Sequence, residues 1–363
     1  MGSTENKIKE IEEELKKTQY NKATEHHIGM LKAKLSHLQM ELEAHRKGGG
    51  GQGFSIPKSG DATVSLVGYP NVGKSSLLNS MTGAESEIGN FAFTTLRVIP
   101  GIMEYQGTKI QILDLPGIIE NASAGSGRGR EVLSVVRNSD LVLIVTDTEA
   151  KGIEGIISEL YKVGIVLNRR KKNISVKKTN SGGIRIHAPR HIDVTEDTIT
   201  SILKEFKITN ADVYIRERIT SDDVIDSLRP SSVFVPSIIV VNKTDVPYNR
   251  EGMVSRIPSG MRFLEVSAKS GKGIEDLKGT VYNGLSLIRV YMREKSGETD
   301  TKRPLVMVDG STVREAVRKI SREMMESFRY AVLSGPKRKF REIRVGLDYP
   351  LNDGDMLTII SRN

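Results

Sequence analysis

Apolar runs separated by longer polar stretches recur through the middle of the chain. The clearest runs cover residues 62–67, 110–113, 140–145, 237–241 and 263–266. They are short and rich in apolar residues, which is typical of strands buried on both faces of a parallel sheet. The stretches between them have helical character. The pattern predicts an α/β domain in which a mostly parallel sheet has helices on both faces.

The first 47 residues carry a helical pattern instead. Apolar residues mark two amphipathic helices, a short one with Ile8, Ile11 and Leu15 and a longer one with Ile28, Leu31, Leu35, Leu38 and Leu42. A turn over residues 18–21 would fold them into a hairpin. The spacing of three and four residues in the second helix indicates a stripe that needs a partner helix. A hairpin within the chain, packing on another domain, and docking of a regulatory protein remain alternatives.

The predicted α/β domain is interrupted and is followed by a further domain. We expect a glycine-rich linker at 48–60, either flexible or held in a tight path, the two parts of the α/β domain at 61–167 and 230–292, and an α+β insert at 168–229. The insert is predicted to contain a β-hairpin over 174–187, a helix over 195–206, a strand over 212–215 and a short helix after Ser221.

The region 301–363 is expected to form a C-terminal domain. Thr312 and Glu315 have the spacing of a capping box at the start of a helix. The buried stripe of this helix is predicted to comprise Val313, Ala316, Val317, Ile320 and Met324. Strands are predicted over residues 304–308, 330–333, 343–345 and 356–360, and together with the helix they indicate a β-grasp fold.

A phosphate-binding loop is the clearest chemical motif. The residues Gly68-Tyr-Pro-Asn-Val-Gly-Lys74-Ser75 follow the first apolar run and precede a helical segment. In this pattern backbone N–H groups surround the phosphates, the lysine reaches the β and γ phosphates, and the serine hydroxyl binds Mg²⁺. Alone, the motif predicts only that a nucleoside triphosphate binds.

Four further motifs follow in the order that a GTPase requires. Thr94-Thr95 can complete the Mg²⁺ shell, and Asp114-Leu-Pro-Gly117 places a carboxylate at the end of a strand beside the metal. Asn242-Lys-Thr-Asp245 supplies a carboxylate that accepts hydrogen bonds from guanine, and Ser267-Ala-Lys269 would close over the base. The residues expected to bind the nucleotide are Gly68, Tyr69, Pro70, Asn71, Val72, Gly73, Lys74, Ser75, Ser76, Asp114, Gly117, Asn242, Lys243, Asp245, Ser267, Ala268 and Lys269.

These motifs, with Phe93-Thr-Thr95 and Gly125-Ser-Gly-Arg-Gly-Arg130, resemble the developmentally regulated GTP-binding (DRG) family within the Obg-related GTPases. The resemblance covers nearly the whole chain. It implies an insert with an S5-domain-2-like fold and a C-terminal TGS-like domain. Two residues depart from the usual pattern: Ala92 stands where proline often precedes Phe-Thr-Thr, and Asn121 where glycine is usual.

Hydrolysis is expected to be slow. The position that holds the water-orienting glutamine in Ras-like enzymes is Ile118 here, so turnover no faster than about 10⁻⁴ s⁻¹ is predicted. Asn71 matches the asparagine that binds a monovalent cation in potassium-activated GTPases, and K⁺ would then supply positive charge. The alternative is that Asn71 only shapes the loop. The expected catalytic residues are Lys74, Thr95 and Asn71, with Ser75, Thr95 and Asp114 for Mg²⁺.

The net charge of +9 is unevenly distributed. Residues 168–191 contain eight Lys or Arg residues and no Asp or Glu, which favours a polyanion partner over a merely solvated loop. The family resemblance implies that this partner is RNA. A second basic cluster with an aromatic residue inside it lies at 337–341. The candidate RNA contacts are Arg169, Arg170, Lys171, Lys172, Lys177, Lys178, Lys337, Arg338 and Lys339.

The composition excludes several kinds of site and segment. The chain of 363 residues contains no cysteine, which excludes disulfides and thiolate metal sites. It shows no apolar run of the roughly 20 residues that a membrane span needs and no signal-peptide core at its N-terminus. We therefore expect a cytoplasmic protein with no membrane partner.

The sequence favours a GTPase that hydrolyses GTP to GDP and acts as a molecular switch on the ribosome or another RNA-rich partner. The alternative is an RNA-binding scaffold in which the nucleotide mainly stabilises the fold. A kinase that uses ATP is disfavoured by Asp245, because adenine does not offer the two donors that this carboxylate would accept.

Overall fold

The computed structural model describes residues 2–19, 21–22, 24–46, 58–82, 98–116, 127–189, 192–230, 232–293, 304–336 and 342–361. The chain forms two compact units. One combines residues 1–54 with 157–235, and the other combines 55–156 with 236–363. Most of the predicted glycine-rich linker lies outside the described residues.

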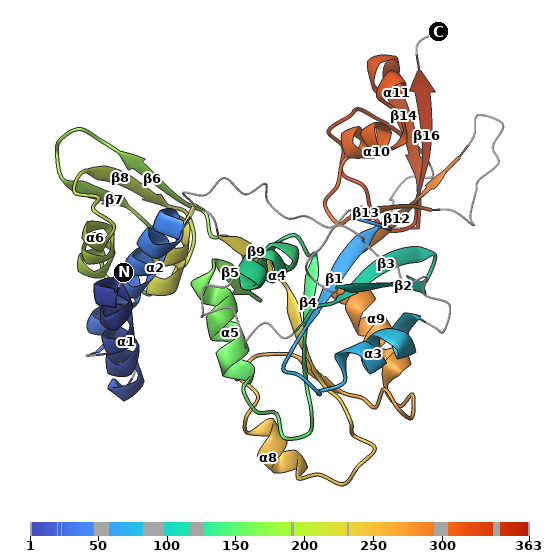
Figure 1. Ribbon diagram of the computed structural model, residues 1–363. Coiled ribbons are helices and arrows are strands. Elements are labelled where there is room, and N and C mark those ends of the chain that lie inside the picture. The colour runs from blue at the N-terminus through green and yellow to red at the C-terminus, as the bar shows by residue number, and fades with distance from the viewer. Residues whose placement is uncertain are drawn as a thin grey trace. The chain divides into compact units, whose positions relative to one another are not determined.

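The second unit contains the predicted α/β domain around a sheet of six strands (Figure 1). Their order is β11-β10-β4-β1-β3-β2, and only β2 runs antiparallel to its neighbour. The strands are β1 (Ala62–Val67), β2 (Ile99–Tyr105), β3 (Thr108–Asp114), β4 (Leu141–Thr146), β10 (Ser237–Val241) and β11 (Phe263–Glu265). This confirms the mostly parallel sheet.

The strands of this domain appear as apolar runs in the sequence because they lie in its core. Every residue of β1, β4 and β10 is buried, as expected for central strands covered on both faces. Leu77 and Leu78 from one helix and Leu277 and Val281 from another pack on the same face of the sheet. The helices of this domain are α3 (Lys74–Thr82), α4 (Gly127–Arg137), α8 (Arg250–Val254) and α9 (Ile274–Gly284), and α5 (Ile153–Lys162) begins in it.

The C-terminal domain is a mixed sheet of five strands with the order β13-β12-β16-β14-β15. Its strands are β12 (Leu287–Met292), β13 (Leu305–Val308), β14 (Phe328–Ser334), β15 (Ile343–Val345) and β16 (Asp355–Ser361). The sequence assigned residues 287–292 to the end of the α/β domain, whereas β12 pairs with β13 and β16 here. The reason is that Ile288 and Val290 complete the apolar core of the C-terminal domain.

Two short helices, α10 (Val313–Ile320) and α11 (Arg322–Glu326), belong to this domain. The predicted capping box of Thr312 and Glu315 is present at the start of α10. Val313, Ala316 and Val317 are buried as expected. Ile320 and Met324 are more than one third exposed, which corrects the predicted stripe. The reason is that the chain leaves the helical path at Ser321, which caps the second helix.

The first unit contains α1 (Gly2–Lys17) and α2 (Glu25–Arg46), which form the predicted helical hairpin (Figure 1). The rest of the unit comprises the end of α5, α6 (Glu196–Glu205), α7 (Ser221–Leu228), and the strands β5 (Ile165–Leu167), β6 (Ile174–Lys178), β7 (Ile184–His187), β8 (Ala211–Ile215) and β9 (Val233–Val235). The short parallel pair of β5 and β9 joins the two ends of the insert.

The strands of the insert do not form the predicted hairpin. Both β6 and β7 pair with β8, antiparallel and parallel respectively, so the order is β6-β8-β7. Ala211, Val213 and Ile215 of β8 are buried, whereas β6 and β7 carry exposed Lys and Arg residues. The most apolar strand therefore takes the central position, and the charged strands take the edges, where charge is favoured.

The apolar stripe of α2 is used inside this unit. Ile28 and Leu31 are buried, and Ala33 joins the core formed by α6, α7 and the sheet. Gly29 allows the close approach, since an added Cβ would lie 3.3 Å from Thr198. Lys32 also forms an ion pair with Asp222 at 2.9 Å. Of the alternatives left open by the sequence, the structure shows packing on another part of the same chain.

None of the helices in the described parts of the chain combines the length and the apolar character needed to cross a bilayer.

Candidate functional site

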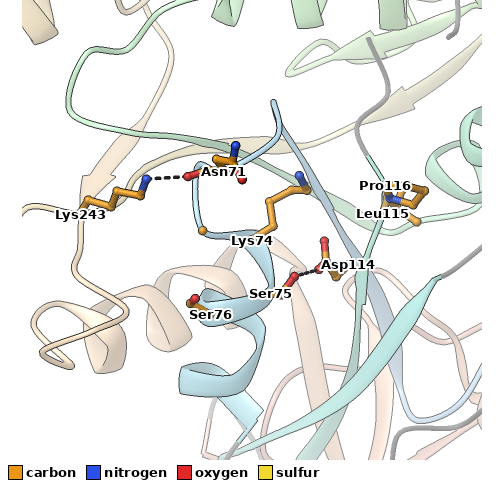
Figure 2. A pocket seen from close by; sticks show the side chains of 9 residues that line it. Asn71, Lys74, Ser75, Ser76, Asp114, Leu115, Pro116 and Lys243 are labelled. Carbon is orange, nitrogen blue, oxygen red and sulfur yellow. Dashed lines mark hydrogen bonds between the residues drawn. The ribbon is translucent and has the colours of Figure 1, made fainter. Parts of the chain in front are cut away.

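Loops that follow β1, β3 and β10 meet at one edge of the central sheet and enclose a cavity of about 470 Å³ (Figure 2). The carboxyl ends of parallel strands are the usual ligand sites of α/β sheets. The lining residues are Asn71, Gly73, Lys74, Ser75, Ser76, Asp114, Leu115, Pro116 and Lys243. Leu115 and Pro116 were not among the predicted contacts, although their place inside the Asp114-to-Gly117 motif was a signal for them.

Two glycines give the loop after β1 its shape. A Cβ on Gly68 would lie 2.3 Å from the carbonyl oxygen of Val145, and one on Gly73 would lie 2.4 Å from the side chain of Asn242. Gly73 also has a φ of 90°, which favours glycine. Asn71 has a φ of 63°, a conformation that asparagine tolerates better than most residues. Both the cation role and the shaping role predicted for Asn71 are compatible with this geometry.

Lys74 begins α3 and points into the loop, where it is only 9% exposed. Its ammonium donates hydrogen bonds to the carbonyl oxygens of Gly68 at 3.2 Å and Tyr69 at 3.1 Å. Burial lowers the pKa of Lys74, although the nearby Asp114 opposes this effect. A phosphate beside the ammonium would stabilise the charged form. Lys74 therefore lies where an anionic ligand would stabilise its charged form.

Ser75 and Asp114 lie together in the cavity, and the serine hydroxyl donates to the carboxylate (Figure 2). Burial raises the pKa of Asp114, while Ser75 and Lys74 act in the opposite direction. A hydroxyl and a carboxylate oxygen are the kind of ligands that Mg²⁺ takes beside phosphate oxygens. These two residues therefore fit the predicted magnesium site. Thr95 and Gly117 lie outside the described residues.

Asn242 connects the phosphate-binding loop to the loop after β11. Its side-chain amide donates to the carbonyl oxygen of Val72 at 3.0 Å, and its side-chain oxygen accepts from the N–H of Ala268 at 3.0 Å. The residue is 2% exposed. Next to it, Lys243 donates to the carbonyl oxygen of Asn71 at 2.6 Å. These contacts bring three of the predicted motifs into one arrangement.

Asp245 contacts the other motif that is predicted to bind the base. The hydroxyl of Ser267 donates to the carboxylate of Asp245 at 2.7 Å, and this hydrogen bond lowers the pKa of Asp245. The other lone pairs of the carboxylate can accept further hydrogen bonds. Lys269 is exposed next to this pair. The remaining predicted contacts, Tyr69 and Pro70, belong to the loop itself, where Tyr69 packs against Gly152.

The predicted RNA contacts of the first unit differ in their surroundings. Arg169 pairs with Asp223 at 2.8 Å and with Asp226 at 3.0 Å, and Arg170 and Lys172 both pair with Glu217. These acidic partners come from sequence far outside the basic block, so the block alone overstated the free positive charge. Lys171, Lys177 and Lys178 are exposed. Lys337, Arg338 and Lys339 lie outside the described residues.

Family models cover most of the chain in three consecutive segments. Residues 63–178 match a model described as a 50S ribosome-binding GTPase, and residues 181–287 match one described as the C-terminal region of that domain. Residues 288–361 match the TGS domain. The start of the TGS match coincides closely with the start of β12.

Full-length relatives agree with these matches. An uncharacterized GTP-binding protein of Methanocaldococcus jannaschii is 45% identical, with 98% of this chain and 92% of that protein covered. Developmentally-regulated GTP-binding protein 1 of Xenopus laevis and developmentally-regulated G-protein 3 of Arabidopsis thaliana are each 40% identical over the whole of both chains. The chain therefore belongs to the developmentally regulated GTP-binding protein family of the Obg-related GTPases.

Proposed function

We propose that this GTP-binding protein hydrolyses GTP to GDP and phosphate and acts as a molecular switch on the ribosome or another RNA-rich partner. One observation carries the proposal: four motifs far apart in the sequence converge at one edge of the sheet. Lys74 and Asp114 line the cavity there, and Asn242 ties the loop around it to the Asp245 and Ser267 pair. A GTPase requires this combination of phosphate-binding and base-reading groups.

In this proposal the residues of the nucleotide site have separate roles. The ammonium of Lys74 neutralises the β and γ phosphates, and backbone N–H groups of the loop and of the start of α3 surround them. Asp245 accepts hydrogen bonds from the ring N–H and the amine of guanine. Ser75 and Asp114, with Thr95, would hold Mg²⁺, which supplies further charge neutralisation when bound. None of these residues is a general base, so we expect slow turnover.

The RNA-rich partner is supported by charge and by the description of the matching family model, a 50S ribosome-binding GTPase. The chain carries a net charge of +9, and exposed lysines remain on the insert after its internal ion pairs are counted. Such charge attracts phosphate backbones.

The proposal places the protein in the cytoplasm. A regulatory protein at the N-terminal helices stays a prediction, restricted to the parts of α1 and α2 that the insert does not cover.

Co-sedimentation with ribosomes tests the proposal. The protein would be sedimented with a non-hydrolysable GTP analogue and with GDP, each across a series of salt concentrations. We expect stronger and salt-sensitive binding with the analogue, because a switch must bind its partner with different affinity in its two states. Absence of binding with either nucleotide would contradict the proposed partner.

A scaffold, in which the nucleotide mainly stabilises the fold, is the second function to be considered, since the exposed lysines of the insert would serve RNA binding without a switch. In a scaffold, GTP and GDP would support equal ribosome binding, and a variant without hydrolysis would retain it. The same sedimentation experiment therefore separates a switch from a scaffold.

Turnover is expected to fall several-fold when K⁺ is replaced by Na⁺ at constant ionic strength. The reason is that Asn71, whose side chain lines the cavity (Figure 2), would hold K⁺ beside the phosphates in place of an arginine finger. Phosphate release under multiple turnover measures the effect. Asn71→Ser should remove the difference between the two salts. Equal rates of the unaltered protein in both salts would leave Asn71 with the shaping role alone.

A further inference from the structure

The open face of the three-stranded insert sheet carries a pair of stacked aromatic rings, which neither GTP hydrolysis nor the attraction of lysines to RNA requires. One face of this sheet packs on α6 and α7 through Ile174, Val176, Ile184 and Ile186. Side chains alternate along a strand, so the residues between them belong to the opposite face. On β6 and β7 these are Ser175, Lys177, Arg185 and His187, and all four are exposed.

Strand pairing arranges this face in two rows. One row consists of Lys177, Asp212 and Arg185, and the other of Ser175, Tyr214 and His187. In the first row Arg185 pairs with Asp212 at 2.9 Å, which neutralises the acidic residue of the face. Lys177 lies opposite the same Asp212 in the strand pairing, so two cations share one carboxylate on this face. The face therefore combines a net positive charge with two aromatic rings.

The two rings are stacked. The rings of His187 and Tyr214 are 4.7 Å apart between centroids and inclined by only 12°. The ammonium of Lys177 lies 5.6 Å from the centroid of the Tyr214 ring. The side chain of His187 is 52% exposed. A planar group can therefore extend the stack on His187, with Tyr214 fixing the orientation of the imidazole from behind.

We propose that this face, which we call the stacking face (Ser175, Lys177, Arg185, His187, Asp212 and Tyr214), binds single-stranded RNA by stacking a base on His187. Lys177 and Arg185 would contact the phosphates on either side. Three paired strands span about 10 Å, which is room for a short unpaired segment. Single-stranded nucleic acid is bound in this way by other open sheets, through aromatic platforms flanked by cations.

An unpaired strand fits this face better than a duplex or an acidic peptide does. Bases inside a duplex are already stacked on each other and offer no free ring face. An acidic peptide would be attracted by Lys177 and Arg185, but it would leave uncovered the face of the exposed imidazole that points away from Tyr214. The stacked rings therefore favour single-stranded RNA over the other two ligands, and Lys177 and Arg185 add attraction to its phosphates.

The inference rests on the proposed function only in naming RNA as the partner. Its test needs neither ribosomes nor hydrolysis: the full chain in GDP is titrated into a labelled 12-nucleotide U-rich RNA and followed by fluorescence anisotropy at several salt concentrations. His187→Ala is expected to weaken binding at least fivefold, because stacking is lost. His187→Phe, which retains a ring, should stay within twofold of the unaltered protein.

Charge is tested by a matched pair of variants. Lys177→Ala should weaken binding and reduce the slope of the salt dependence by about one. Lys34→Ala removes the same charge from an exposed position on α2 of the same unit and should change neither quantity. Thermal unfolding of each variant shows whether the insert remains folded.

Three results would overturn the proposal: unchanged affinity in His187→Ala, equal affinity for a duplex of the same length, or equal competition by a glutamate peptide of the same charge. The last result would identify an acidic protein as the partner. The proposed switch is judged separately. Ribosome binding that does not depend on the nucleotide would reject the switch and leave the RNA result standing. Nucleotide-dependent ribosome binding, combined with an affinity for the 12-nucleotide RNA that His187→Ala leaves unchanged, would reject the stacking face alone.

Discussion

Asp245→Asn is expected to lower the affinity for GTP roughly a hundredfold and to raise the affinity for xanthosine triphosphate by a similar factor. The hydroxyl of Ser267 donates to the carboxylate of Asp245 and lowers its pKa, and the carboxylate would accept hydrogen bonds from two N–H groups of guanine. Hydrogen bonds to charged groups are among the stronger ones, so losing them costs about this much. Asparagine instead offers a donor to the carbonyl group that xanthine has in place of the amine.

Titration of labelled GTP and xanthosine triphosphate measures both affinities in one assay. Glu251→Gln is the matched control, because it converts an exposed carboxylate on α8 of the same unit into an amide and should not affect the choice of base. ATP should bind weakly to all three proteins. An unchanged affinity of Asp245→Asn for GTP would remove Asp245 from the base-binding site.

Arg169→Ala is expected to destabilise the first unit by about 2 kcal/mol. Its guanidinium faces Asp223 and Asp226, whose side chains are 8% and 2% exposed, and removing one partner of a buried ion pair leaves uncompensated charge. The cost stays below the largest values for such sites because Arg169 itself is 31% exposed. Burial already raises the pKa of Asp226, so this carboxylate depends strongly on its remaining partners.

Urea unfolding of the full chain measures the effect, provided that the transitions of the two units are resolved. Arg170→Ala is the control, since Arg170 is 72% exposed and pairs with Glu217 near the surface. That variant should lose less than about 0.5 kcal/mol. Adding Asp226→Asn to Arg169→Ala should restore part of the stability. If the two single arginine variants unfold alike, the buried pairs do not stabilise the unit.

The nucleotide motifs were readable from sequence because each is a local pattern whose residues act within one loop. The structure places Lys74, Ser75 and Asp114 around one cavity as the pattern required. The hydrogen bonds by which Asn242 links two loops could not be predicted from the sequence. Its side chain bonds to Val72 and Ala268, which are distant in sequence, and no local pattern encodes such a contact.

The two topological differences also have a physical explanation. Alternating runs at 174–178 and 184–187 looked like a hairpin because they are close in sequence, yet a more apolar strand further along the chain inserts between them. The strand Leu287–Met292 looked like part of the preceding domain for the same reason of proximity. Strand pairing depends on which faces must be buried, and sequence order is only a guide to it.

The sequence by itself determined the family, the α/β class and the phosphate-binding and base-reading motifs, because hydrophobic periodicity and short loop motifs depend on residues close together in the chain. Only the tertiary structure decided which basic residues are neutralised, where the stripe of α2 packs, and that His187 and Tyr214 stack on an open face. These features arise between segments that are far apart in sequence, where the free energy of packing and charge pairing selects the partners.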